Sequence, residues 1–326
     1  MDRRAFITGL AAGALLASRS AHAQKAVGVH RIGWLSPDSA ASDLRNLEAL
    51  RAGLREISYV EGQNLTIEAR WAEGRSERLP QLAAELVRLP VDVLCTAGSQ
   101  ASGAAKQATS TIPIVFANVA FPDQSGLVAS YQLPGGNVTG VAFIGPEYGK
   151  RLELLQEAHP KLSRVALIYN SDNPGSVLAL QETRRWATRL GVSLEPHKLR
   201  GPHDFEHVFA AISTKRPDAL MTTADPLIAS YRTRIVTFAA KHRLLSMYPG
   251  REFVDVGGLM FYGGSVPEMY RRAAVYVDRI LKGAKPSQLP VEQPTKFDMV
   301  INLRTAKALG LSIPRSLLAR ADQIIE

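Results

Sequence analysis

The sequence predicts an α/β fold in which two doubly wound parallel-sheet lobes are joined by three hinge crossovers. From Val27 onward, apolar runs too short for helices alternate with amphipathic segments of helical period, which is typical of parallel βα units. The alternation starts again at Glu147, which indicates a second lobe. The tail after Gly257 is too short to bury a core of its own, so its strands and helices must complete the two earlier sheets.

The N-terminus has the pattern of an export signal. Arg3 and Arg4 precede an apolar run at 5–17, and residues 21–23 form a small-x-small cleavage site. The run is too short to span a bilayer, so we expect cleavage after Ala23 and a periplasmic mature protein. No cysteine follows the run, which excludes a lipid anchor at the cleavage site. Both the general secretory route and the twin-arginine route stay open.

The first lobe is expected to begin with two strand–helix pairs. Apolar residues recur at helical spacing in both helices, and Pro80 falls in a first turn, where its missing N–H is tolerated. The predicted elements are the strand Val27–Leu35, the helix Ser42–Ile57, the strand Asn64–Trp71 and a helix capped by Ser76.

The stretch Val91–Gly126 is the central unit of this lobe. Val91–Cys95 and Ile114–Phe116 are predicted as buried parallel strands, separated by a helix at Gln100–Ala108. Polar loops follow both strands and therefore meet at one edge of the sheet, where open α/β sheets bind ligands. A further strand is predicted at Val138–Phe143.

The second lobe repeats the architecture without repeating the residues. Polar, turn-forming residues again follow each predicted strand, and Gly191 is at a position where it can end a helix. The predicted elements are helices at Glu147–His159, Val177–Leu190, Phe205–Ser213 with Asp204 as cap, and Leu227–Arg243, and strands at Arg164–Tyr169, Val192–Lys198, Asp218–Thr222 and Leu244–Tyr248.

The tail sets the expected domain boundaries. It contains strands at Gly258–Phe261 and Phe297–Ile301, a helix at Val266–Leu281 and a helix closed by Gly310. Sharing these between the sheets requires crossings near Ala142–Pro146, Arg251–Gly258 and Lys285–Pro294. The expected division is a signal peptide at 1–23, a first lobe at 24–142 plus 257–287, and a second lobe at 143–256 plus 288–326.

Composition excludes several classes of function. The formal charge is +9, but the basic residues are dispersed and no basic–aromatic tract indicates nucleic-acid binding. The one cysteine, Cys95, lies in a predicted strand and is expected to be a buried apolar residue, so no intrachain disulfide forms. We expect a monomer without a cofactor.

The sequence contains two partial motifs, one for phosphate binding and one for metal binding, and neither predicts a functional site. Residues 145–151 are one residue short of a phosphate loop and lack the Ser or Thr after the lysine. His203 and His207 have metal-ligand spacing, but Asp204 between them is explained as a helix cap, so no metal is expected. None of the seven histidines lies at a predicted strand end facing the cleft.

Residues at the carboxyl ends of the strands are the candidate ligand-binding site. Hydroxyls and helix-start N–H groups can hold a carboxylate, and Asp225 can pair with an ammonium group. Taken singly, most of these residues are equally explained as turn or cap residues. The candidates are Ser36, Gly98, Ser99, Asn118, Asn170, Ser171, Asp225, Tyr248 and Tyr262. Trp34 and Phe121 are further candidates for an aromatic wall, beside Tyr248 and Tyr262.

Several segments carry a family resemblance over essentially the whole mature chain. They are Tyr59–Asn64, Leu133–Gly140, Gly257–Met260, Leu289–Phe297 and Val300–Gly310. In these segments the chain resembles the solute-binding family of ABC transporters that includes tryptophan- and tyrosine-binding members. Its layout resembles the type I periplasmic binding fold. Where such sequences often read Gly-Asp-Pro-Val, this chain has Ala120–Gln124, and this departure leaves open whether it shares the ligand of better-known members.

The resemblance implies an exported protein that captures a small ligand between two lobes and delivers it to an ABC permease in the inner membrane. An amino acid, aromatic in the first instance, or a related carboxylate is the expected ligand. Two alternatives stay open at this point. One is an exported α/β hydrolase-type enzyme, and the other is a ligand sensor for a membrane receptor.

Overall fold

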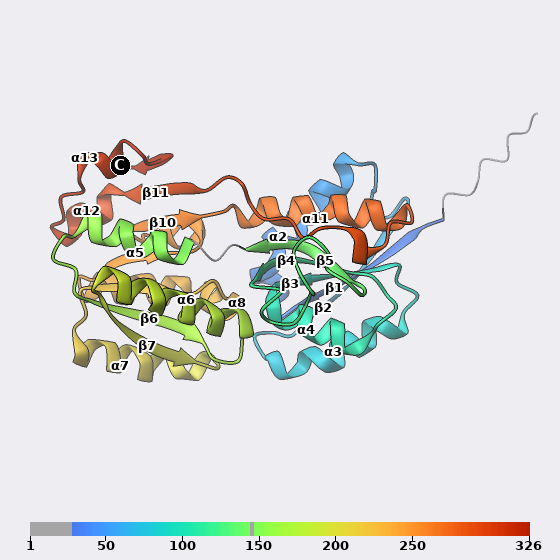
Figure 1. The fold of residues 1–326 in the computed structure, drawn as a ribbon, viewed down its shortest axis with the longest axis horizontal. Helices are drawn as coiled ribbons and strands as arrows, with labels where there is room; N and C mark the ends of the chain where they lie inside the picture. Colours follow the sequence, from blue (N-terminus) through green and yellow to red (C-terminus); the bar gives the residue numbers. More distant parts are fainter. Residues whose placement is uncertain (1–27, 144–146) are drawn as a thin grey trace, which may run out of the picture.

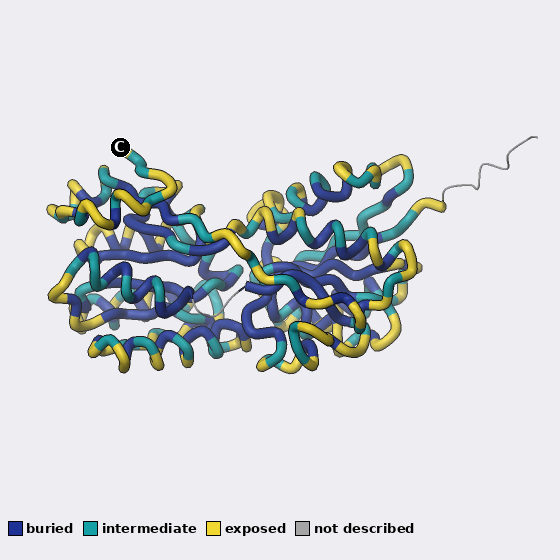
Figure 2. Tube along the Cα trace, turned by 45° about the horizontal axis from the view of Figure 1, so that its top comes forward, coloured by how far each residue is buried: buried dark blue, intermediate teal, exposed yellow. Residues whose placement is uncertain are grey.

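The computed structural model describes residues 28–143 and 147–326, which form two lobes side by side (Figure 1). The expected signal peptide at 1–23 and most of the first expected crossing lie outside the described residues. Each lobe is a sheet with helices on both faces, and Figure 2 shows the strands of both sheets buried beneath them. Within these residues, no helix combines the length and apolar character needed to cross a bilayer.

The first sheet is entirely parallel and has the order β2-β1-β3-β4-β5. Its strands are mostly buried on both faces, which explains their continuous apolar runs. The strands are β1 (His30–Ser36), β2 (Leu65–Trp71), β3 (Val93–Ala97), β4 (Ile114–Ala120) and β5 (Val138–Phe143). One face packs on α3 (Leu79–Arg88) and α4 (Gly98–Ala108), and the other on α2 (Ala40–Glu56) and α11 (Val266–Leu281).

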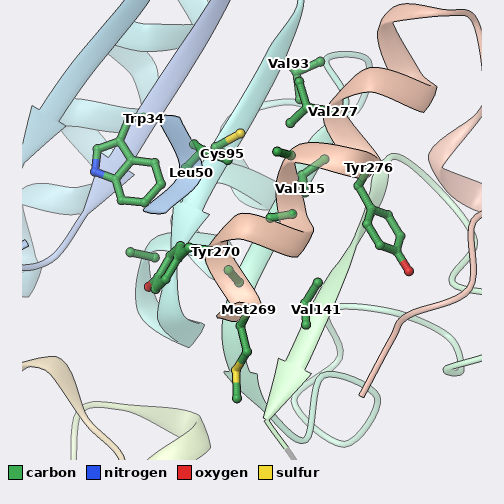
Figure 3. Close-up of a cluster of buried hydrophobic side chains, with 14 of the residues drawn as sticks. Trp34, Leu50, Val93, Cys95, Val115, Val141, Met269, Tyr270, Tyr276 and Val277 are labelled. Atoms are coloured by element: carbon green, nitrogen blue, oxygen red, sulfur yellow. The ribbon is translucent and has the colours of Figure 1, made fainter. Parts of the chain in front are cut away.

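Helix α11 comes from the tail and completes the first core. The face that it turns to the sheet carries Tyr270, Ala273, Ala274 and Val277, which are all at most 2% exposed. Figure 3 shows side chains of α11 directed at the strands, and the rings of Tyr270 and Trp34 lie 5.6 Å apart. The predicted burial of Cys95 in this cluster is confirmed.

The second sheet has the order β12-β11-β10-β9-β8-β6-β7 and is parallel except for the β10–β11 pair. Its strands are β6 (Arg164–Asn170), β7 (Ser193–Leu199), β8 (Ala219–Thr222), β9 (Leu245–Tyr248), β10 (Met260–Gly263), β11 (Asp298–Asn302) and β12 (Gln323–Ile325). One face is covered by α5 (Glu147–Ala158), α6 (Pro174–Leu190), α12 (Leu303–Leu309) and α13 (Arg315–Leu318). The other is covered by α7 (Phe205–Lys215), α8 (Pro226–Ser230), α9 (Arg232–Lys241) and α10 (Arg251–Asp255).

The expected lobe boundary at residue 257 is wrong for β10. Met260 and Phe261 pair with Met247 and Tyr248 of β9, so this strand belongs to the second sheet and not to the first lobe. The second crossing therefore follows Gly263 and leads into α11, whereas the expected crossing at 251–258 is occupied largely by α10. Figure 1 shows the segments after β10 and before β11 crossing between the lobes.

The boundary at 288 is also wrong by a few residues. The N–H of Glu292 donates to the carbonyl of Gly140, and the N–H of Ala142 donates back to Glu292. The chain thus pairs with β5 of the first lobe until Glu292, and the third crossing lies between Glu292 and β11.

Three local predictions need correction. The helix predicted at 227–243 is two helices, α8 and α9, which meet at Tyr231. Ser76 lies in the short 3₁₀ turn η1 (Ser76–Arg78) before α3 and does not cap it. Asp204 ends the turn η2 (Pro202–Asp204), and its carboxylate accepts the N–H groups of Arg200 and Gly201 instead of capping α7. The caps at Gly191 and Gly310 are confirmed, since both have the left-handed conformation.

Candidate ligand-binding site

A cavity of about 210 Å³ lies between the lobes. The first lobe contributes the loop after β1, the ends of β3 to β5 and the start of α11, and the second lobe contributes the loop after β8, α8 and α10. A second hollow, of about 490 Å³, lies between α7 and α9 and takes no residue from the first lobe. Of these two hollows, the cavity between the lobes is therefore the one whose shape depends on how the lobes are placed relative to each other.

Two buried carboxylates face this cavity, one from each lobe. Asp38 follows β1 and accepts a hydrogen bond of 3.1 Å from the hydroxyl of Ser230 in α8. Asp225 caps α8 and accepts from the amide of Asn173 at 2.8 Å and from the N–H of Ile228 at 3.1 Å. Burial raises the pKa of both carboxyl groups, and with the nearby carboxylate of Asp43 it brings the pKa of Asp38 to about 7.

A third carboxylate, Asp43 of α2, lies behind the first. It accepts from the indole N–H of Trp34 at 2.7 Å, the indole N–H of Trp71 at 3.1 Å and the amide of Asn46 at 3.0 Å. Burial raises its pKa although these hydrogen bonds act in the opposite direction. Asp43 thus has a structural role, fixing two tryptophans next to the cavity.

Asn118 supplies a further acceptor from the first lobe. It sits where β4 shifts register against β5, in the left-handed conformation with φ 58°. Asparagine tolerates this conformation better than most residues. Its Oδ1 is buried and has no hydrogen-bond partner among residues 28–143 and 147–326, and the residue lines the cavity. A ligand N–H group would satisfy this oxygen.

Cations and aromatic rings complete the cavity wall. Arg45 of α2 and Arg232 of α9 both lie within electrostatic reach of Glu252 of α10, whose pKa is raised chiefly by burial. The aromatic part of the wall is made by Phe143, Phe253, Phe261 and Tyr270. The cavity therefore combines acceptors, guanidinium donors and apolar surface, as expected for a site that binds a small amphipathic ligand.

Outside the cavity the lobes are already in contact beside the N-terminus of α4. A Cβ atom on Gly175 of α6 would lie 2.6 Å from Ser99 Oγ, and one on Gly98 would lie 3.6 Å from Pro226. The amide of Gln100 donates to the carbonyl of Asp172 at 3.2 Å. Together with the Ser230–Asp38 hydrogen bond, these contacts show that the two lobes are in a closed arrangement.

Residues 36–325 match the family model described as ABC transporter substrate binding protein. The chain belongs to this family of solute-binding proteins. A tyrosine-binding protein from Clostridioides difficile (strain R20291) is 24% identical over 259 residues, which cover 79% of this chain and 74% of the relative.

Two solved structures share the fold of this substrate-binding protein over 91% of its chain and 99% of theirs. One is a conserved domain protein from Vibrio cholerae, with a TM-score of 0.87 and 27% identity. The other is an ABC domain from Streptococcus pneumonia in complex with L-Trp, with a TM-score of 0.85 and 26% identity. The fold is the type I periplasmic binding fold, and the family consists of solute-binding proteins rather than enzymes.

Of the nine candidate residues, the structure brings Asn118 and Asp225 to the cavity of this substrate-binding protein. Gly98 and Ser99 lie instead at the contact between the lobes. Ser36 is fully buried and accepts the N–H of Asp38, so it shapes the loop that carries this carboxylate.

The remaining candidates have structural partners. Asn170 accepts the N–H of Asp172, and Ser171 donates to the carbonyl of Leu199. Tyr248 stacks on Phe253 with ring centroids 4.6 Å apart, and Tyr262 stacks on Phe297 at 6.0 Å. The suggested aromatic wall is different from the observed one, because Trp34 is buried against α11 and Phe121 stacks on Tyr148.

Asp38, Arg45, Arg232, Glu252 and Tyr270 line the cavity but were not predicted. The position of Asp38 in the sequence could have indicated its place in the site, because it follows Ser36-Pro37 in a loop that is expected at the cleft. As for the histidines, His203 and His207 are both exposed, and within the described ranges no cluster of metal-ligating residues is found.

We expect Asp38→Asn to stabilise the ligand-free protein above pH 7. Since the pKa of Asp38 is about 7 when folded and about 3.8 as a free side chain, the cost of ionising it is absent below pH 3.8 and fully present above pH 7. This difference of about three pKa units corresponds to at most about 4 kcal/mol in the free energy of unfolding. Urea unfolding at pH 5 and pH 8 should show a smaller loss of stability between the two pH values in the variant. Equal pH dependence in both proteins would contradict the assignment.

Proposed function

We propose that this protein is the exported solute-binding component of an ABC transporter, and that it captures an amino acid or a related small carboxylate. Aromatic amino acids are the first candidates. The ligand is enclosed between the lobes by hinge closure and is then presented to a permease in the inner membrane, with the protein acting as a monomer.

The observation that carries the proposal is a cavity whose polar groups come from both lobes. Asn118 and Asp38 belong to the first lobe, and Asp225 and Arg232 to the second. Only a ligand that contacts both walls can favour the closed arrangement over the open one, which is the requirement for capture by closure.

The chemistry of the wall supports the ligand class. Arg45 and Arg232 can pair with a carboxylate, and Phe143, Phe253 and Tyr270 offer apolar faces to a side chain. The L-Trp complex of the Streptococcus pneumonia relative and the tyrosine-binding relative support an amino-acid ligand for this chain. The apolar run and small-x-small site in residues 1–23 support export.

A thermal-shift screen of amino acids and aromatic acids tests the proposal. A ligand at about 100 times its Kd stabilises the folded state by about 2.7 kcal/mol, which shifts the midpoint by several degrees in a chain of this size. At least one amino acid should give such a shift. Stabilisation by none of the compounds at millimolar concentration would overturn the ligand class.

A further inference from the structure

Asp38 and Asp225 approach the same cavity from opposite lobes and are both deeply buried, at 9% and 6% exposure. They are also connected across the cleft. Ser230, which donates to Asp38, is the last residue of α8, and Asp225 caps the same helix. The spacing of the two carboxylates therefore depends on closure of the lobes.

These two carboxylates differ from other acidic groups around the cavity, which have a cationic partner or cations within electrostatic reach. Asp255 pairs with Arg251 at 3.4 Å and Asp298 pairs with Lys296 at 3.1 Å. Glu252 forms no ion pair in the described ranges, but Arg232 and Arg45 lie within electrostatic reach of it. Asp38 and Asp225 receive hydrogen bonds from a hydroxyl, an amide and a backbone N–H, all of them neutral. In the described part of the chain neither one forms an ion pair, although Arg45 and Arg232 line the same cavity.

Among the described residues, the groups with the largest effect on the pKa of Asp38 include no cation. The groups that face it are Asp43 of α2, Ser230 of α8, Tyr270 of α11 and Asp225 itself. Burial is the main cause of the raised pKa of Asp38, and repulsion from Asp43 and, more weakly, from Asp225 adds to it. A positive charge placed between the carboxylates would relieve this repulsion.

Asn118 adds an independent indication. Its buried Oδ1 has no hydrogen-bond partner in the part of the chain that the structure describes, and Asn118 lines the same cavity as the two carboxylates. Three oxygen acceptors thus line one cavity, two of them from carboxyl groups, and a group rich in N–H donors would complement all three.

We infer that the ligand must carry a cationic nitrogen, and that Asp38 from the first lobe and Asp225 from the second hold it jointly, with Asn118 as the third acceptor. The inference rests on the proposed function, because it concerns the same cavity. It adds a selection rule: the site takes amines and amino acids and rejects carboxylic acids that lack the nitrogen. Because one carboxylate comes from each lobe, the cation also links the lobes in the closed form.

The test measures binding by isothermal titration calorimetry at pH 8. The probes are the standard amino acids, the amines tyramine and tryptamine, and the deaminated acids 3-(4-hydroxyphenyl)propionate and indole-3-propionate. The variants are Asp38→Asn and Asp225→Asn, which keep an acceptor oxygen, and in the second case keep a good helix cap. Glu61→Gln is the control, since it removes one charge at an exposed residue that is paired with Arg51 at 2.7 Å and does not line the cavity.

We expect every binder to carry a cationic nitrogen, and each of the two variants to lose affinity by about 10-fold or more, as for a charge-assisted hydrogen bond. Glu61→Gln should stay within about 2-fold. A deaminated acid that binds as well as its amino acid, or full affinity in both variants, would overturn the inference and leave the proposed function standing. Binding of amines but of no amino acid would overturn the proposed ligand class and support the inference. Binding of no probe would overturn both.

Discussion

Gly175→Leu is expected to hold the lobes apart and to weaken ligand binding by about 100-fold. Gly175 lies in the first turn of α6 in the second lobe, where even a Cβ atom would come within 2.6 Å of Ser99 Oγ and 3.4 Å of the Ala120 side chain in the first lobe. A Cβ alone can be accommodated by rotating Ser99, but a leucine side chain cannot. A ligand that prefers the closed form must then overcome this clash, and about 2.7 kcal/mol of added cost is 100-fold in affinity.

The measurement for Gly175→Leu is a binding titration together with small-angle X-ray scattering. The variant should have a larger radius of gyration than the native protein and should not contract when ligand is added. Gly103→Leu in α4 is the control, because a Cβ there meets no atom within 4 Å. Native affinity in Gly175→Leu would show that the contact between α4 and α6 is not part of the closed form.

Arg151→Met is expected to lower the free energy of unfolding by about 3–5 kcal/mol, the range for breaking a buried ion pair from one side. Arg151 of α5 is fully buried. It donates to Glu147 at 2.7 Å and to the carbonyl of Tyr262 at 2.7 Å, and its guanidinium lies 5.5 Å from the ring centroid of Phe143 and 5.0 Å from that of Tyr148. Phe143 is the last residue of β5 in the first lobe, and Tyr262 lies in β10 of the second lobe next to the second crossing, so the arginine connects the end of β5 to β10.

Chemical denaturation measures this loss directly. Arg185→Met is the comparison, since Arg185 pairs with Glu182 on α6 but is 68% exposed, and an exposed pair contributes about 0–1 kcal/mol. A change below about 1 kcal/mol in Arg151→Met would mean that its packing and hydrogen bonds are replaced by methionine without cost, and the hinge would have to be stabilised elsewhere.

The sequence predicted the two-lobe α/β architecture because parallel strands buried on both faces leave a clear local pattern. β3, β4 and β5 are apolar runs bounded by polar residues, and the inward face of α11 repeats at helical spacing. The sheet to which a strand belongs has no such pattern. β10 is four residues long, and its place in the second sheet depends on pairing with β9, a tertiary interaction.

The site was predicted less completely, for a geometric reason. Successive side chains of a strand point to opposite faces, so a residue at a strand end can face the cavity or the core. Asn118 reaches the cavity because of a register shift in β4, whereas Tyr248 at the end of β9 packs on Phe253. Glu252 was missed because α10 spans only five residues, too few to show helical periodicity.

The central claim is that the solute occupies the cavity between the lobes, and calorimetry of Ala229→Trp tests it most directly. Ala229 of α8 lines this cavity, and an indole there would fill it, while Ala210→Trp places the same side chain in the hollow between α7 and α9. With an amino acid that stabilises the native protein, we expect one ligand per chain for the native protein and for Ala210→Trp, and no measurable binding to Ala229→Trp. Unchanged binding to Ala229→Trp, or loss of binding in Ala210→Trp alone, would contradict the claim.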